Sequence, residues 1–139
     1  MSFVLDNSIA LAWCFEDEQT APIMALLDRV TETGAVAPQL WPIEALNVLL
    51  TAERRGRIDD ADRRRFASFL QDLPIAIDDE TTSRTWTATA DLAERHGLTA
   101  YDAVYLELAL RSGLPLATGD KSLRLAARNA GAALLPGGS

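Results

Sequence analysis

The chain has 139 residues, 48% of them hydrophobic and 24% charged, which is the balance of one folded domain and excludes a disordered chain. No apolar stretch reaches the roughly 18 residues of a membrane span, and Asp6 comes too early for a signal peptide, so we expect a cytoplasmic protein with no membrane partner. The single cysteine, Cys14, excludes an internal disulfide and fits a reducing compartment. The net charge of -7 argues against broad electrostatic binding to nucleic acid.

Short apolar runs that predict strands alternate along the chain with longer amphipathic patterns that predict helices. We expect strands over residues 2–5, 35–37, 75–77, 116–117 and 132–135, and helices over 8–16, 23–33, 42–55, 60–73, 80–95, 101–111 and 122–129. In the helix over 80–95, Trp86, Ala90 and Ala93 are expected to point inward. This alternation predicts one α/β domain over residues 1–135, with a mainly parallel sheet covered by helices on both faces and a short tail over 136–139.

Four acidic residues stand at positions where α/β proteins build their sites. Asp6 directly follows the first predicted strand, and Asp120 closely follows the fourth. Glu44 and Asp102 stand near the starts of two apolar helices. Each acid alone is explained by helix capping or by the helix dipole. Strand ends of a parallel sheet share one edge, however, so the joint pattern indicates a common acidic site.

Such a cluster of carboxylates requires a counter-charge. Two carboxylates about 5 Å apart repel each other by roughly 3 kcal/mol at an effective dielectric constant of about 20. A divalent cation removes this repulsion, and oxygen ligands select Mg²⁺ or Mn²⁺. Zinc is not expected, because His96 and Cys14 are the only residues of their types. The bound ion would activate water for phosphodiester hydrolysis, with the hydroxyls of Ser8 and Thr118 orienting ligands or water molecules.

Positive charge is concentrated in one segment of this acidic chain. Six of its 13 Lys and Arg residues lie together: Arg54, Arg55, Arg57, Arg63, Arg64 and Arg65. We expect Arg54, Arg55 and Arg57 to hold an RNA backbone. Ordinary solvated helix ends are the alternative.

Four motifs resemble, in order and spacing, those of PIN-domain nucleases, and within that family those of VapC-type toxins of bacterial toxin–antitoxin pairs. The motifs cover residues 4–8, 44–47, 98–106 and 116–121. The resemblance implies a three-layer α/β/α sandwich, RNA cleavage with Mg²⁺ or Mn²⁺, a homodimer and inhibition by a cognate antitoxin. It makes an acidic quartet of Asp6, Glu44, Asp102 and Asp120, with polar support from Ser8, Asn47 and Thr118. Glu107 lies either near this site or towards solvent.

A second enzymatic hypothesis is phosphoryl transfer through an aspartyl phosphate, as in phosphatases or receiver domains. Asp6, Thr118 and Lys121 can be fitted to it. Such a site needs a second acid beside the first, and the only tandem pair behind a predicted strand is Asp78-Asp79.

A third hypothesis is a non-catalytic binding module with an apolar partner surface. Trp13, Phe15 and Trp41 would form that surface, unless they are core residues, as most large apolar side chains are. For a toxin, we expect Trp13 and Phe15 to anchor the inhibitory partner near Asp6.

Overall fold

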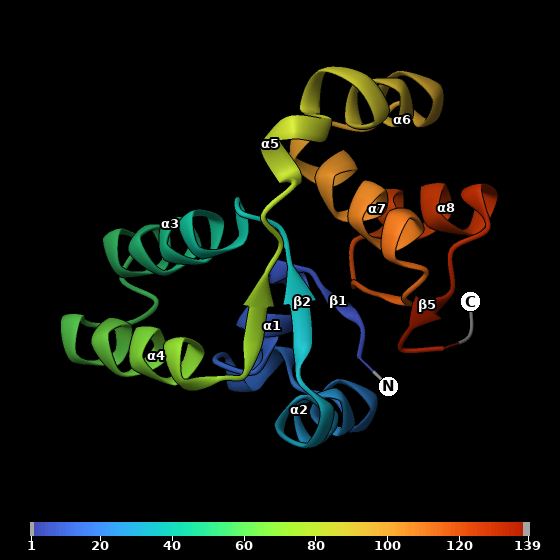
Figure 1. Cartoon of the computed structure of the whole chain (residues 1–139). Helices are drawn as coiled ribbons and strands as arrows, with labels where there is room; N and C mark the ends of the chain where they lie inside the picture. Colours follow the sequence, from blue (N-terminus) through green and yellow to red (C-terminus); the bar gives the residue numbers. More distant parts are fainter. Residues whose placement is uncertain (1, 138–139) are drawn as a thin grey trace.

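A five-stranded parallel sheet forms the centre of the protein, which is described over residues 2–137 in a computed structural model (Figure 1). The strands are β1 (Val4–Leu5), β2 (Ala35–Ala37), β3 (Ile75–Ile77), β4 (Leu116–Ala117) and β5 (Leu134–Leu135). They lie in the order β3-β2-β1-β4-β5, and each neighbouring pair is parallel. The chain order reverses between β1 and β4, so the crevice outside their carboxyl ends is the topological switch point of the sheet.

Helices cover both faces of this sheet. They are α1 (Asn7–Ala12), α2 (Ala21–Thr33), α3 (Trp41–Arg54), α4 (Asp60–Asp72), α5 (Thr81–Arg84), α6 (Ala90–His96), α7 (Ala100–Ser112) and α8 (Lys121–Ala130), with a 3₁₀ turn at Glu16–Glu18 and a π-helical turn at Thr85–Thr89. The pair α3 and α4 lies on one side of the strands, and α7 and α8 lie on the other (Figure 1). The predicted α/β/α sandwich with a parallel sheet is therefore confirmed. Within residues 2–137, no helix is long and apolar enough to cross a membrane.

Side-chain caps begin several of these helices. Asp59 caps α4 by accepting a hydrogen bond from the Asp62 backbone N–H at 2.7 Å, and Asp62 completes a capping box. Thr20 caps α2 in the same way through the Ile23 N–H. Of the predicted tail over 136–139, Gly138 and Ser139 lie outside the described residues.

The first helix is shorter than predicted, and its aromatic end belongs to the core. The helix α1 ends at Ala12 instead of near Glu16, because the Trp13 indole N–H donates to the Ile23 carbonyl at 2.8 Å and ties the turn to α2. Trp13, Phe15 and Trp41 are only 5%, 5% and 6% exposed. The predicted apolar partner surface on these residues is therefore wrong, and so is an inhibitor dock on Trp13 and Phe15.

The segment over 80–95 also differs from its predicted pattern. It is divided into α5, the π turn and α6, and the wider π turn shifts which side chains face inward. Trp86 is 89% exposed and Ala90 is exposed, whereas Thr89 is buried. The prediction that Trp86 and Ala90 point inward is wrong because it assumed an uninterrupted α-helical period.

Candidate active site

Asp6 lies buried at the switch point, directly after β1. Its Oδ2 atom accepts hydrogen bonds from Ser8 Oγ and Thr118 Oγ1, both at 2.7 Å. Thr118 directly follows β4, and the Gly119 backbone N–H donates to Ser8 Oγ at 2.8 Å. These bonds join the ends of the two central strands. Burial raises the pKa of Asp6 above its ordinary value, and the two hydroxyl hydrogen bonds offset part of that rise.

Glu44, in the first turn of α3, is held by two residues that sequence reasoning missed. Its Oε1 atom accepts from the Tyr105 hydroxyl at 2.6 Å and from Asn7 Nδ2 at 3.2 Å. Burial raises the pKa of Glu44, and the charge of Asp6 adds to the rise. A signal for Tyr105 exists in the sequence, because a tyrosine on an otherwise apolar helix, one turn after Asp102, needs a partner for its hydroxyl.

Asp102 stands in the first turn of α7, which Thr99 caps by accepting from the Asp102 N–H at 3.1 Å. Among residues 2–137, no group donates a hydrogen bond to the Asp102 carboxylate. The pKa of Asp102 is raised to about 6, first by burial and then by the negative charges of Asp120, Asp6 and Glu44. The fold therefore brings the four predicted acids within electrostatic range of one another.

Asp120 has two functions at once in this geometry. Its Oδ2 atom caps α8 by accepting from the Leu123 N–H at 3.0 Å, which is the structural role that its position suggests. Its own N–H donates to Thr118 Oγ1 at 3.1 Å, which ties it to the group around Asp6. The capping role and the place beside Asp102 are therefore compatible.

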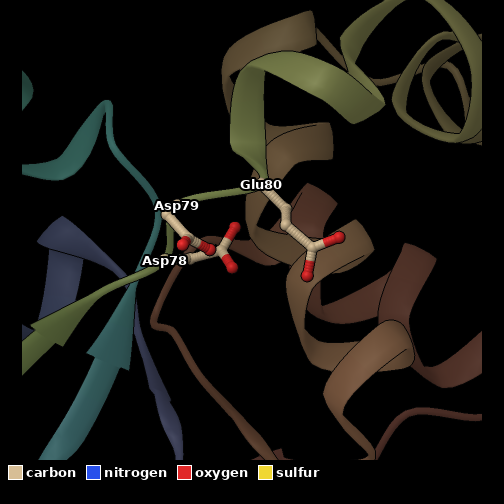
Figure 2. A group of neighbouring side chains, drawn as sticks. All are labelled: Asp78, Asp79 and Glu80. Carbon is tan, nitrogen blue, oxygen red and sulfur yellow. The ribbon is translucent and has the colours of Figure 1, made fainter.

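The carboxylates of the four acids influence one another electrostatically, but they do not form a tight cluster. In the described part of the chain, no three of them hold oxygen atoms within 4.8 Å of one another; the group that does is Asp78, Asp79 and Glu80, at the turn between β3 and α5 (Figure 2). Arg111 pairs with two members of that group, donating to Asp78 at 2.8 and 3.1 Å and to Glu80 at 3.4 Å. It also donates to both carboxylate oxygens of Glu107, which is 4% exposed. Glu107 therefore pairs with Arg111 instead of facing solvent, and of the tandem acids that phosphoryl transfer would need, Asp78 is held in the same ion-pair network.

The donor atoms of the quartet fit a hard divalent cation. They are all oxygens, and the Oδ1 atom of Asn7, beside Glu44, is buried without a hydrogen-bond partner. Oxygen ligands of this kind suit Mg²⁺ and Mn²⁺. Cys14 does not offer a thiolate, because burial raises its pKa to about 12.

The supporting residues expected from sequence divide into two groups. Ser8 and Thr118 hydrogen-bond to Asp6, as described above. Asn47 is exposed and makes no hydrogen bond to any residue over 2–137, because it points outward from α3. The amide group beside the acids belongs to Asn7 instead.

The arginines expected to contact RNA lie at the far end of α3. Ten residues, or about 15 Å of helix, separate Glu44 from Arg54. Arg54 and Arg55 are exposed, and no hydrogen bond or ion pair joins their guanidinium groups to the described residues. The third arginine, Arg57, already has partners. Its guanidinium group lies 3.9 Å from the Phe15 ring centroid. It also forms ion pairs with two acids of the 3₁₀ turn, Asp17 at 2.8 Å and Glu18 at 2.9 Å.

Residues 3–129 match the model of the PIN domain family, so the chain belongs to that family. PIN domains are generally metal-dependent nucleases and typically bind a divalent metal ion. No protein sequence with a curated description matches this chain.

Solved structures share this fold along nearly the whole chain. The PAE2754 protein from Pyrobaculum aerophilum is 25% identical, with a TM-score of 0.70 over 97% of this chain and 90% of that one. FitAcB from Neisseria gonorrhoeae is 17% identical, with a TM-score of 0.67 over 96% of each chain. VapBC2 from Rickettsia felis, solved with a DNA fragment from its promoter, is 11% identical, with a TM-score of 0.65 over 96% of this chain and 97% of that one.

Proposed function

We propose that this PIN domain is a Mg²⁺- or Mn²⁺-dependent endoribonuclease whose acidic quartet supports hydrolysis of RNA phosphodiester bonds. The observation that supports it best is the environment of Asp102. Burial raises the pKa of Asp102, the charges of Asp120, Asp6 and Glu44 raise it further, and no described cationic side chain pairs with these four acids. A site built this way favours a divalent cation.

The hydrogen bonds of the quartet leave one side of each anchored acid for a ligand. The bonds to Asp6, Glu44 and Asp120 described above each go to a single carboxylate oxygen. Asp6 and Asp102 would hold the cation chiefly, with Glu44 and Asp120 binding directly or through water. The cation, when bound, lowers the pKa of its water and offsets charge on the phosphate. The protein then needs no nucleophile of its own, and its hydroxyl groups keep the acids oriented.

Metal-dependent cleavage of a defined RNA tests this proposal. The wild-type protein should cleave with Mg²⁺ or Mn²⁺ and not with a chelator, and Asp102→Asn should abolish cleavage. Asp79→Asn is the matched control, because it removes one carboxylate from the other acidic group at the same sheet edge. Cleavage that survives both chelation and Asp102→Asn would refute the proposal.

We further propose that the protein is the toxin of a toxin–antitoxin pair, because its motifs resemble those of VapC-type toxins. With Trp13 and Phe15 in the core, we propose that the antitoxin docks in the apolar groove of about 280 Å³ between α3 and α4. This groove begins at Trp41 and Pro42, less than one turn before Glu44.

An amphipathic segment in this groove could place an arginine on the acidic quartet, where a bidentate pair with a carboxylate is strong. Inhibitor and metal would then compete, so excess Mg²⁺ should weaken inhibition. Co-expression with an adjacent small gene, followed by purification and a cleavage assay, tests the partner. A failure to form a complex, or a complex that cleaves as fast as the free protein, would reject it.

A homodimer is also proposed on the same resemblance. Ile43, in the first turn of α3, is 69% exposed and offers apolar area for a second copy. Light scattering on the wild-type protein and on Ile43→Asp measures the oligomeric state. A wild-type monomer at micromolar concentration would exclude the dimer.

A further inference from the structure

An exposed aromatic residue stands next to an acid of the quartet in the first turn of α7. Tyr101 occupies the first turn of α7 and directly precedes Asp102. It is 62% exposed, and its hydroxyl group makes no hydrogen bond to residues 2–137. Large aromatic side chains normally bury most of their surface. The packing of the protein therefore does not account for this ring.

An exposed cation stands next to another acid of the quartet, at the start of α8. Lys121 directly follows Asp120, begins α8 and is the only lysine in the chain. It is exposed, and within residues 2–137 no hydrogen bond or ion pair engages its ammonium group. The N-terminus of a helix is where the dipole disfavours a positive charge. Stabilisation of α8 therefore does not explain why a lysine occupies this position.

The fold places the two helices that carry these residues in contact. The helices α7 and α8 lie side by side (Figure 1); Asp102 stands in the first turn of α7, and Asp120 is the N-cap of α8. The nearest arginine on α8 is already engaged, since Arg124 donates to the backbone carbonyls of Thr118 and Leu135 at 2.8 and 3.3 Å. Lys121 is thus the cation of α8 closest to the acids that remains available for a ligand.

We propose that Tyr101 and Lys121 form the substrate-binding rim of the quartet, where the Tyr101 ring stacks on an unpaired base and the Lys121 ammonium binds a neighbouring phosphate. This inference rests on the proposed nuclease function and assigns two residues of this chain to the binding of an unpaired stretch of its RNA substrate. Bases in a duplex are stacked on both faces, whereas unpaired bases offer a face to an aromatic side chain. The lysine provides attraction for the backbone on a protein of net charge -7.

Binding of a labelled single-stranded RNA, measured by fluorescence anisotropy with Mg²⁺ in an Asp6→Asn background that does not cleave, tests the ring. Tyr101→Ala should weaken binding roughly tenfold, the effect expected when one base no longer stacks on an aromatic ring. Tyr101→Phe keeps the ring and should bind like the parent protein. Trp86→Ala, which removes an even more exposed aromatic from the neighbouring π turn, is the matched control and should have no effect.

The salt dependence of the same binding tests the lysine. Lys121→Gln should reduce the slope of log affinity against log salt by about 0.7, the value for one phosphate bound on a single strand. Arg128→Gln removes an equal charge near the other end of α8 and should leave the slope unchanged. Because Lys121 is the only lysine, bound RNA should also protect a single site from amine acylation, which peptide mass measurement detects.

Four results would refute the proposed rim. For the ring, they are a Tyr101→Ala variant that binds RNA as tightly as the parent protein, or Tyr101→Phe and Tyr101→Ala variants that lose equal affinity. For the lysine, it is a Lys121→Gln variant with the same salt dependence of binding as the parent, and for the substrate, it is duplex RNA that binds as tightly as a single strand. Unchanged unfolding midpoints in urea for Tyr101→Ala and Lys121→Gln would support a role in binding, and large losses of stability would indicate a structural role instead. If wild-type protein still cleaves RNA and Asp102→Asn does not, only the rim fails; if wild-type protein does not cleave, the nuclease proposal fails as well.

Discussion

Arg111 holds the carboxyl end of β3 to α7, and its removal should destabilise the protein strongly. All five of its N–H groups have acceptors: two on Asp78, two on Glu107 and one on Glu80. The side chains of Arg111, Asp78 and Glu107 are only 17%, 9% and 5% exposed. In Arg111→Met, the apolar stem is retained but two buried carboxylates lose their partner.

The expected loss is about 3–5 kcal/mol in the free energy of unfolding, because breaking a buried ion pair leaves an uncompensated charge. For a domain of this size, that loss lowers the melting temperature on the order of 10–15 °C. Arg84→Met is the control, since its pair with Glu80 is 42% and 50% exposed and should contribute less than about 1 kcal/mol. Replacing Glu107 by Met in the Arg111→Met background removes one orphaned charge and should restore part of the loss.

The pH dependence gives a second measurement of the same network. Arg111 holds the pKa of Asp78 below its ordinary value of 3.8, so this pair stabilises the folded protein above that pH. The stabilisation is lost as the pH falls through the lowered pKa of the folded state. The difference between wild type and Arg111→Met in urea unfolding should therefore narrow below about pH 4. A loss under about 1 kcal/mol at pH 7 would refute the view that these charges are desolvated.

Three further outcomes follow from the site and the core. The pKa of Asp102 is raised to about 6, so the metal-free protein should lose stability as the pH rises from about 4 to above 6, and Asp102→Asn should lack this loss in urea unfolding. Neutralising Arg54 and Arg55 should reduce the slope of log affinity for RNA against log salt by about 0.7 for each phosphate that is no longer bound. Arg64→Gln should leave this slope unchanged, because Arg64 is already paired with Asp60. Trp13→Ala should lower the free energy of unfolding by about 3–5 kcal/mol, because the indole is buried in the core. A variant as stable as the wild type would show that Trp13 is not a core residue.

Local patterns in the sequence were enough to predict the elements and the carboxylates. The strand–helix alternation follows from hydrophobic periodicity, which depends only on neighbours along the chain. The cap at Asp59 follows from the same local chemistry, and the short run into Asp6 identifies a strand end. The edge that these strand ends share follows from parallel pairing alone, so the quartet could be proposed without knowing the strand order.

Long-range contacts decided what local patterns cannot encode. The hydrogen bond from Tyr105 to Glu44 joins residues 61 positions apart, and the pairing of Arg57 with Asp17 joins residues 40 apart. The exposure of Trp86 depends on a π turn that no hydrophobic period indicates. Such features form when separate elements pack and their polar groups are removed from water. The interaction free energy that favours them therefore arises only in the folded chain and cannot be read from neighbouring residues.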